Sequence, residues 1–248
     1  MMIRARYSKT GHMRFLSHLD LVRLFERAFR RAQMPLAFTQ GYNPHPIISF
    51  AAPLSVGVGS IAEYVDVQLT EPVSPDTFVH LMNEILPPGI MIMQATAKDP
   101  KTADSLMQEA AIMQYQLTFK ATNSLELASL QKRHQHFMEL EEIIIEKKQK
   151  KKNKQRHRRN ADKVKRIDIV PYFHKCTFEI LEEDTIVLDL CIYVTQNGTI
   201  KPGLVLQQWL DHCSLHIDSD NLTIERTEIY RKTGSGFEPI LPAVHAST

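Results

Sequence analysis

The sequence lacks long hydrophobic runs and has only three cysteines, nine glycines and one tryptophan. No stretch approaches the run of about 20 uncharged apolar residues that a membrane-spanning helix needs, so we expect no membrane contact. The N-terminal residues MMIRARYSKTG have no apolar core, which argues against a secretory signal. The odd cysteine count argues against a disulfide framework and indicates a reducing cytoplasm.

Recognisable metal and nucleotide motifs are also missing. The cysteines form no CxxC pair, and Cys191 alternates with Leu188, Leu190 and Ile192 in a pattern where a small buried residue is expected. We therefore interpret Cys176, Cys191 and Cys213 as structural. The sequence has no HExxH motif, and the glycines at 57–63 lack the context of a dinucleotide-binding loop. We expect neither a metal nor a cofactor on this chain.

Positive charge is concentrated in two places. Residues 147–166 hold 12 of the 30 Lys and Arg residues and one acid, whereas the rest of the chain has a balance of −9. Residues 1–50 hold eight bases and two acids. A solvated loop would explain the basic run, but so many neighbouring cations repel one another, and we favour a nucleic-acid contact. The expected contacts in this basic arm are Lys150, Lys151, Lys152, Lys154, Arg156, Arg158 and Arg159.

The pattern of elements predicts an α+β fold. Residues 1–97 follow the order strand, helix, strand, strand, helix, strand, with helix starts at Ser17 and Ser74. This is the order of a ferredoxin-like (split βαβ) domain. After a linker at 98–110, residues 111–248 repeat the order with an extra hairpin that ends in the basic arm, 147–166. We predict two ferredoxin-like domains in tandem, the second with an inserted basic hairpin.

Two groups of basic residues in the first domain are candidate nucleic-acid contacts. Arg4 and Arg6 alternate with apolar residues, so we expect them on the open sheet face with Tyr64 and Asp66. The helix that starts at Ser17 has Arg23, Arg27 and Arg30 on its polar face, with Arg31 nearby.

Histidine is the residue type here that could support catalysis near neutral pH. His18 begins the first predicted helix, and His45 lies between two prolines beside Asn43. A neutral imidazole can act as a general base on an RNA 2′-OH, which makes His18 and His45 weak catalytic candidates. His45 and Asn43 are equally candidates for gripping a phosphate or a base edge.

The stretch from residue 6 to residue 69 resembles the bacterial radical-SAM-linked family of unknown function. The motifs RYSK, RFLSHLDL, RRA and GYNPHP carry the resemblance, and RIDIVPYF and TIKPGLVLQQWL extend it more weakly. Ile47 departs from the family pattern, in which a lysine follows PHP. The motif residues without an obvious scaffold role are Arg6, Lys9, Arg14, His18, Arg23, Asn43 and His45.

The resemblance implies a partner rather than a reaction. Family members accompany a radical SAM protein with a cobalamin-binding-like region, near genes for a ribonuclease and ribosomal proteins. This chain has no CxxxCxxC motif, so an iron–sulfur cluster would have to sit on the partner.

We therefore expect a non-catalytic RNA-binding or substrate-presenting partner of that enzyme, acting on tRNA, rRNA or the ribosome. The alternatives are a metal-independent endoribonuclease similar to the CRISPR repeat-processing proteins and a protein–protein adaptor without RNA.

Overall fold

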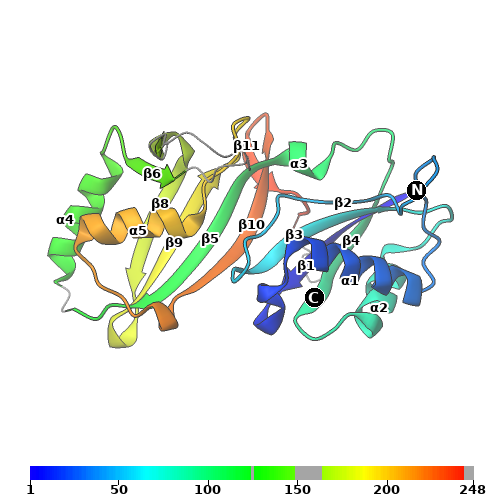
Figure 1. The fold of residues 1–248 in the computed structure, drawn as a ribbon, viewed down its shortest axis with the longest axis horizontal. Coiled ribbons are helices and arrows are strands. Elements are labelled where there is room, and N and C mark those ends of the chain that lie inside the picture. The colour runs from blue at the N-terminus through cyan, green and yellow to red at the C-terminus, as the bar shows by residue number, and fades with distance from the viewer. Residues whose placement is uncertain (124–125, 149–163, 243–248) are drawn as a thin grey trace, which may run out of the picture.

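The computed structural model describes residues 1–123, 126–148 and 164–242 (Figure 1). The first unit, residues 2–98, forms one sheet in the strand order β4-β1-β3-β2, with antiparallel pairing throughout. Its elements are β1 (Met2–Lys9), the 3-10 turn η1 (Gly11–Phe15), α1 (His18–Arg31), β2 (Ile48–Phe50), β3 (Gly59–Gln68), α2 (Pro75–Ile85) and β4 (Ile90–Lys98).

The second unit, residues 110–239, repeats this topology in the strand order β10-β5-β9-β8. Its elements are β5 (Ala110–Lys120), α4 (Leu127–Met138), β8 (Phe173–Ile180), β9 (Thr185–Tyr193), α5 (Pro202–Cys213), β10 (Thr223–Thr233) and β11 (Gly236–Pro239). Between α4 and β8, strands β6 (Ile144–Lys148) and β7 (Val164–Asp168) form a separate antiparallel hairpin. Short 3-10 turns lie at Val170–Tyr172, Glu182–Asp184 and Ser219–Asn221.

The predicted α+β, ferredoxin-like fold class is confirmed. Each unit places its first and third strands in the centre of its sheet, as a split βαβ arrangement requires. The sequence did not indicate that the units share a sheet. Gly59 and Ser60 of β3 pair in parallel with Glu225 and Arg226 of β10, which gives one sheet of nine strands.

Both helices of the first unit begin where the sequence places their N-caps. The Ser17 and Ser74 hydroxyls accept hydrogen bonds from the backbone N–H groups three residues later, which satisfies one free donor at each helix start. Helix α1 then buries Phe25 and Phe29, and the ring of Phe29 lies 6.0 Å from that of Phe78 on α2. The two helices therefore pack on the same face of the sheet and share one core.

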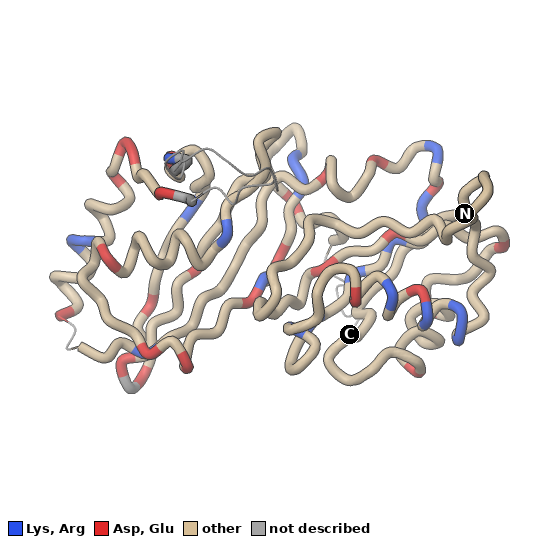
Figure 2. Tube along the Cα trace, viewed as in Figure 1, with Lys and Arg blue, Asp and Glu red and all other residues tan. Residues whose placement is uncertain are grey.

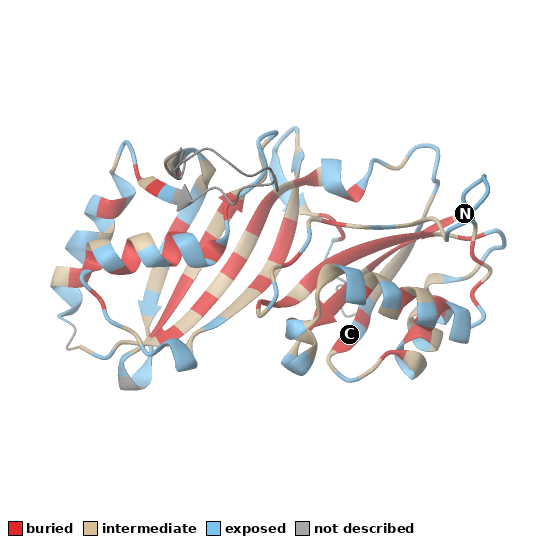
Figure 3. Cartoon of the chain, in the orientation of Figure 1, coloured by how far each residue is buried: buried red, intermediate tan, exposed pale blue. Residues whose placement is uncertain are grey.

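The opposite sheet face differs between the two units. Figure 3 shows β1 and β3 buried along nearly their whole length, whereas buried and half-buried residues alternate along β5 and β9. The central strands of the first unit are thus covered on both faces, whereas Met91 and Met93 of its edge strand β4 are exposed. The second unit has one face against α4 and α5 and one face that solvent reaches.

The segment predicted as a linker helps to cover the first unit. Residues 106–109 form a short helix, α3 (Leu106–Glu109), in which Leu106 is buried. The chain after β11 covers the same face, since Ile240 and Leu241 are buried and the Gln94 amide donates to the Pro242 carbonyl. Among the described helices, none is long and apolar enough to span a membrane.

Candidate nucleic-acid interface

Helix α1 presents an exposed basic face. Its apolar stripe is buried in the first unit, so the residues at the complementary helical positions point outward. Arg23, Arg27, Arg30 and Arg31 are all exposed. Figure 2 marks the Lys and Arg positions of the backbone in blue, and several lie along this helix. Arg23 approaches Asp20 at 3.7 Å, a solvent-exposed pair that contributes little. In the described part of the chain, the other three guanidinium groups have no ion pair or hydrogen bond.

The turn before α1 adds an arginine stacked on an aromatic ring. The Arg14 guanidinium lies 4.9 Å from the centre of the Phe15 ring, and Phe15 is 56% exposed. The Nε atom of Arg14 is buried and has no hydrogen-bond partner within the described residues. The turn before α1 therefore presents a cation together with an exposed aromatic ring.

The prediction that Lys9 is available to nucleic acid is wrong. Lys9 is buried, and its ammonium group donates to the Leu16 carbonyl at 2.8 Å, which ties β1 to the start of α1. Burial lowers the pKa of Lys9, and the nearby Glu63 carboxylate opposes that shift.

Two further candidates lie far from each other. His18 packs edge-on against Phe50, with 5.7 Å between ring centres. His45 is exposed in the GYNPHP loop beside exposed Asn43, and its backbone N–H donates to the Thr39 hydroxyl. Because His45 precedes Phe50 by five residues of mostly extended chain, roughly 16 Å of backbone separates them. His18 and His45 therefore do not form a joint acid–base pair.

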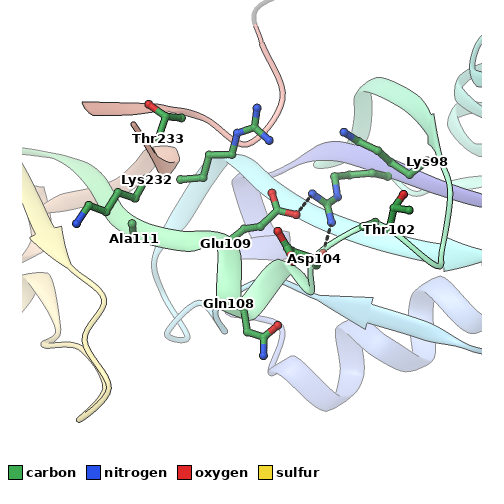
Figure 4. Close-up of a pocket in the computed structure, with 11 residues that line it drawn as sticks. Lys98, Thr102, Asp104, Gln108, Glu109, Ala111, Lys232 and Thr233 are labelled. Carbon is green, nitrogen blue, oxygen red and sulfur yellow. Dashed lines mark hydrogen bonds and ion pairs between the residues drawn. The ribbon is translucent and has the colours of Figure 1, made fainter. Parts of the chain in front are cut away.

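The expectation that Arg4 and Arg6 face an open sheet is also wrong. Arg4 is 1% exposed, and its guanidinium binds both carboxylate oxygens of Asp66 at 2.8 and 2.9 Å. It also pairs with Glu109 of α3 and donates to the Asp104 carbonyl (Figure 4). Burial raises the pKa of Asp66, and the Arg4 contact partly offsets this effect. Arg4 thus fastens α3 to the sheet.

Arg6 and Tyr64 hold the first unit to the second. Arg6 pairs with Glu228 of β10 at 3.0 Å, and the Tyr64 hydroxyl donates to the same carboxylate at 2.7 Å. Burial, followed by the Glu228 charge, raises the pKa of Tyr64. These side chains were placed on the correct face by strand alternation, but that face is closed by residues from the second half of the chain.

A pocket of about 550 Å³ lies where Arg4 meets the second unit (Figure 4). Lys98, Arg231 and Lys232 bring positive charge to it, and Asp104 and Glu109 bring negative charge. Arg231 is already paired with Glu238 at 2.6 Å. Arg4 is likewise paired, with Asp66 and Glu109, so two of the four cations that line the pocket are already bound to carboxylates, and we assign this pocket to the junction between the units.

Sequence reasoning missed Arg226, which lies on the helical side of the same junction. Its guanidinium donates to Glu63 at 2.9 Å, to the Tyr115 hydroxyl at 3.0 Å and to the Ala52 carbonyl at 3.0 Å. The Glu63 carboxylate and the Tyr115 hydroxyl raise the pKa of Arg226 against the effect of burial, which is the largest and lowers it. A single arginine in a strand gives no sequence signal that would distinguish this role.

The predicted arm contacts Lys150, Lys151, Lys152, Lys154, Arg156, Arg158 and Arg159 lie outside the described residues. The base of their hairpin is described, and a groove of about 560 Å³ lies beside it. Exposed Arg166 and Lys201 line this groove together with Tyr172, Asn197 and Thr199. The described base of the hairpin, β6 and β7, belongs to the second unit and α1 to the first, so these elements lie in different halves of the molecule (Figure 1).

The cysteines and histidines that the structure describes do not gather into a metal site. No group of three or more metal-ligating side chains occurs within residues 1–123, 126–148 and 164–242. Burial raises the pKa of Cys176 to about 12 and that of Cys213 to about 11, so both remain thiols. The prediction that Cys191 is buried is wrong, because it lies half-buried on the accessible sheet face.

Comparison with known proteins gives one family match. The family model described as "uncharacterized protein conserved in bacteria" (DUF2344) matches residues 2–202. No curated protein matches the chain. Among solved structures, the chain is similar to a chain in the crystal structure of a Cbf5-Nop10-Gar1 complex, with 9% sequence identity and a TM-score of 0.46. The similarity covers 92% of this chain and 48% of the other, so this chain spans about half the length of the one it matches.

Proposed function

Since the chain belongs to this family of uncharacterized bacterial proteins, we propose its function from its surface: it is a non-catalytic RNA-binding protein that presents RNA to a radical SAM enzyme. The observation that carries the proposal is the exposed basic face of α1. The rest of the chain outside the basic arm is acidic, with a balance of −9, yet four arginines lie within nine consecutive residues of this helix.

The spacing of these arginines costs stability in the absence of a partner. Arg27 lies four residues from both Arg23 and Arg31, and three from Arg30, so like charges are neighbours on the helix surface. Each such pair destabilises a helix by about 0.2–0.5 kcal/mol. Glu26 forms no ion pair with them among the described residues. A phosphate backbone would neutralise this face, and stacked Arg14 and Phe15 would add a surface for an unpaired base.

The partner half of the proposal rests on the resemblance of residues 6–69 to the radical-SAM-linked family. A chain without CxxxCxxC leaves the cluster and its chemistry to another polypeptide. The separation of His18 from His45 and the packing of His18 against Phe50 favour a binding role over RNA cleavage.

Salt-dependent RNA binding tests the proposal. We would measure the affinity for tRNA and for rRNA fragments by fluorescence anisotropy at several salt concentrations. The variant Arg27→Gln/Arg30→Gln/Arg31→Gln should lower the slope of log affinity against log salt by about 2–3, because each lost phosphate contact removes about 0.7–0.9. The control Lys101→Gln/Lys132→Gln/Lys232→Gln removes the same charge from scattered exposed positions and should change the slope by less than one.

The basic arm is tested separately by a deletion that keeps its hairpin. Lys148 pairs with Val164, so an Asn-Gly turn can replace residues 149–163 without disturbing β6 and β7. This variant should bind RNA more weakly, with a flatter salt dependence. Unchanged affinity would remove the arm from the proposal, and equal slopes for the α1 variant and its control would remove α1.

Crosslinking in cells identifies the partners. Brief UV crosslinking followed by purification should recover a specific tRNA or rRNA segment together with the radical SAM protein. Recovery of that protein without RNA, also after nuclease treatment, would instead establish a protein–protein adaptor.

A further inference from the structure

The accessible face of the second unit carries a pocket of about 300 Å³. The strand register explains why its side chains meet there. Gln114 of β5 is opposite Cys191 of β9, which is opposite Lys175 of β8, and the next row joins Asp189 to Thr177. Side chains in neighbouring rows of one face point to the same side of a sheet, so these groups form the pocket floor.

Aromatic rings form the wall of this pocket. His174 lies 5.3 Å from Phe237 of β11 and 5.1 Å from Tyr193, measured between ring centres. The His174 Nδ1 atom and the Tyr193 hydroxyl are 2.7 Å apart, which fixes the imidazole plane. Phe237 is 38% exposed, although an aromatic ring of this size is normally covered. Tyr230 also lines the pocket, and its hydroxyl donates to Gln114 Oε1 at 2.7 Å.

Most polar groups of the floor have no protein partner in the part of the chain that the structure describes. Within the described residues, the side chains of Lys175, Thr177 and Asp189 make no hydrogen bond and no ion pair. Gln114 accepts from Tyr230 through Oε1, which leaves its amide N–H groups available. Lys175 and Thr177 are exposed and Asp189 is half-buried, so these groups are accessible to a ligand that enters the pocket.

We propose that this pocket binds a nucleobase of the RNA strand, an inference that rests on the proposed function for the source of the base. A base has two flat faces that stack on rings such as Phe237 and Tyr230. Its edge places hydrogen-bond donors beside acceptors, which matches the Asp189 carboxylate next to the Gln114 amide and the Lys175 ammonium group. A phosphate or a ribose alone offers no flat face for the aromatic wall.

Fluorescence of 2-aminopurine tests this assignment, because stacking quenches the fluorophore. A single-stranded RNA with one 2-aminopurine should be quenched by the full chain. Phe237→Ala should weaken the quenched complex by about tenfold, which corresponds to one stacking contact. Asp189→Asn should weaken the same complex because the base edge loses a charged acceptor, while the stacking contact remains. The control Leu127→Ala removes another exposed apolar side chain, on α4, and should leave the quenching unchanged.

The outcomes separate this pocket from the basic surfaces. If anisotropy shows salt-dependent RNA binding but Phe237→Ala leaves the quenching unchanged, the pocket assignment is overturned and RNA binding is retained. If the chain does not bind RNA but quenches free 2-aminopurine riboside in a way that requires Phe237, the pocket binds nucleosides and the proposed function fails. Absence of quenching with both probes overturns the pocket assignment.

Discussion

Replacement of Glu63 by Gln tests how the two units are held together. Glu63 of β3 and Arg226 of β10 are 4% and 1% exposed, and their charged groups are 2.9 Å apart. Gln keeps the size and one acceptor of the glutamate but removes its charge. The buried guanidinium would then have only neutral partners, namely the amide oxygen introduced at position 63, the Ala52 carbonyl and the Tyr115 hydroxyl.

The expected loss of stability is large. Removal of one partner from a buried ion pair costs about 3–5 kcal/mol, because the remaining charge stays buried without compensation. Lys9 adds a second buried cation that Glu63 stabilises. The two neutral acceptors of Arg226 remain, so we expect the lower end of this range, about 3 kcal/mol. For a chain of this length, that loss lowers Tm by roughly 6–12 °C.

Urea denaturation gives the free energy of unfolding, and calorimetry gives Tm. The double variant Glu63→Gln/Arg226→Met removes both charges and should be more stable than the sum of the two single losses predicts. A loss below about 1 kcal/mol for Glu63→Gln would refute the reasoning, because the pair would then contribute no more than an exposed one. Strict additivity in the double variant would show that the two side chains act independently.

Two further predictions concern the core of the second unit and the turn before β4. The Nδ1 atom of His134 accepts a hydrogen bond from Trp209 Nε1 at 3.0 Å. Burial lowers the pKa of His134 below its unfolded value of 6.5. Its contribution to stability is therefore complete above pH 6.5 and is lost as pH falls through that value, so His134→Gln should flatten the fall in Tm between about pH 7.5 and pH 5, measured by calorimetry. At Gly89, φ is +95° and an added Cβ would lie 2.7 Å from the Thr10 carbonyl oxygen, so Gly89→Ala should cost about 1–3 kcal/mol in urea denaturation. Gly41 is also at positive φ, but no atom lies within 4 Å of an added Cβ, so Gly41→Ala should cost less stability. Equal losses of stability in the two variants would show that the clash at Gly89 does not matter.

The helices and most strands could be predicted because their signals are local. Ser17 and Ser74 cap the helices that they precede, and Pro75 occupies the first turn. The 3-10 turn η1, the short strand β2 and the final strand β11 were harder to predict. In residues 36–50, single bridges such as Leu36 to Leu69 replace much of the expected strand pairing. Partners distant in the chain determine how far such pairing extends.

The covered sheet face could not be predicted for the same reason. Alternation along β1 correctly assigned Arg4 and Arg6 to the face opposite the helices, but it contains no information about what else lies there. Arg4 pairs with Asp66 on the same face, but its second partner, Glu109, and the partner of Arg6, Glu228, are more than 100 residues further along the chain. A pair of in-phase arginines on a strand has the same sequence pattern whether it meets a phosphate or a buried carboxylate.

This ambiguity divides the motif residues into two groups with different meanings. Arg6 and Lys9 are enclosed by protein, so they influence a ligand only through the positions of β1 and the start of α1. Arg23, Asn43 and His45 reach solvent and can contact a partner directly. The closure of the first sheet face by α3 and residues 240–242 leaves the second unit with the accessible sheet surface. Substitutions in the first group should therefore change stability and RNA binding together, whereas those in the second group should change binding alone.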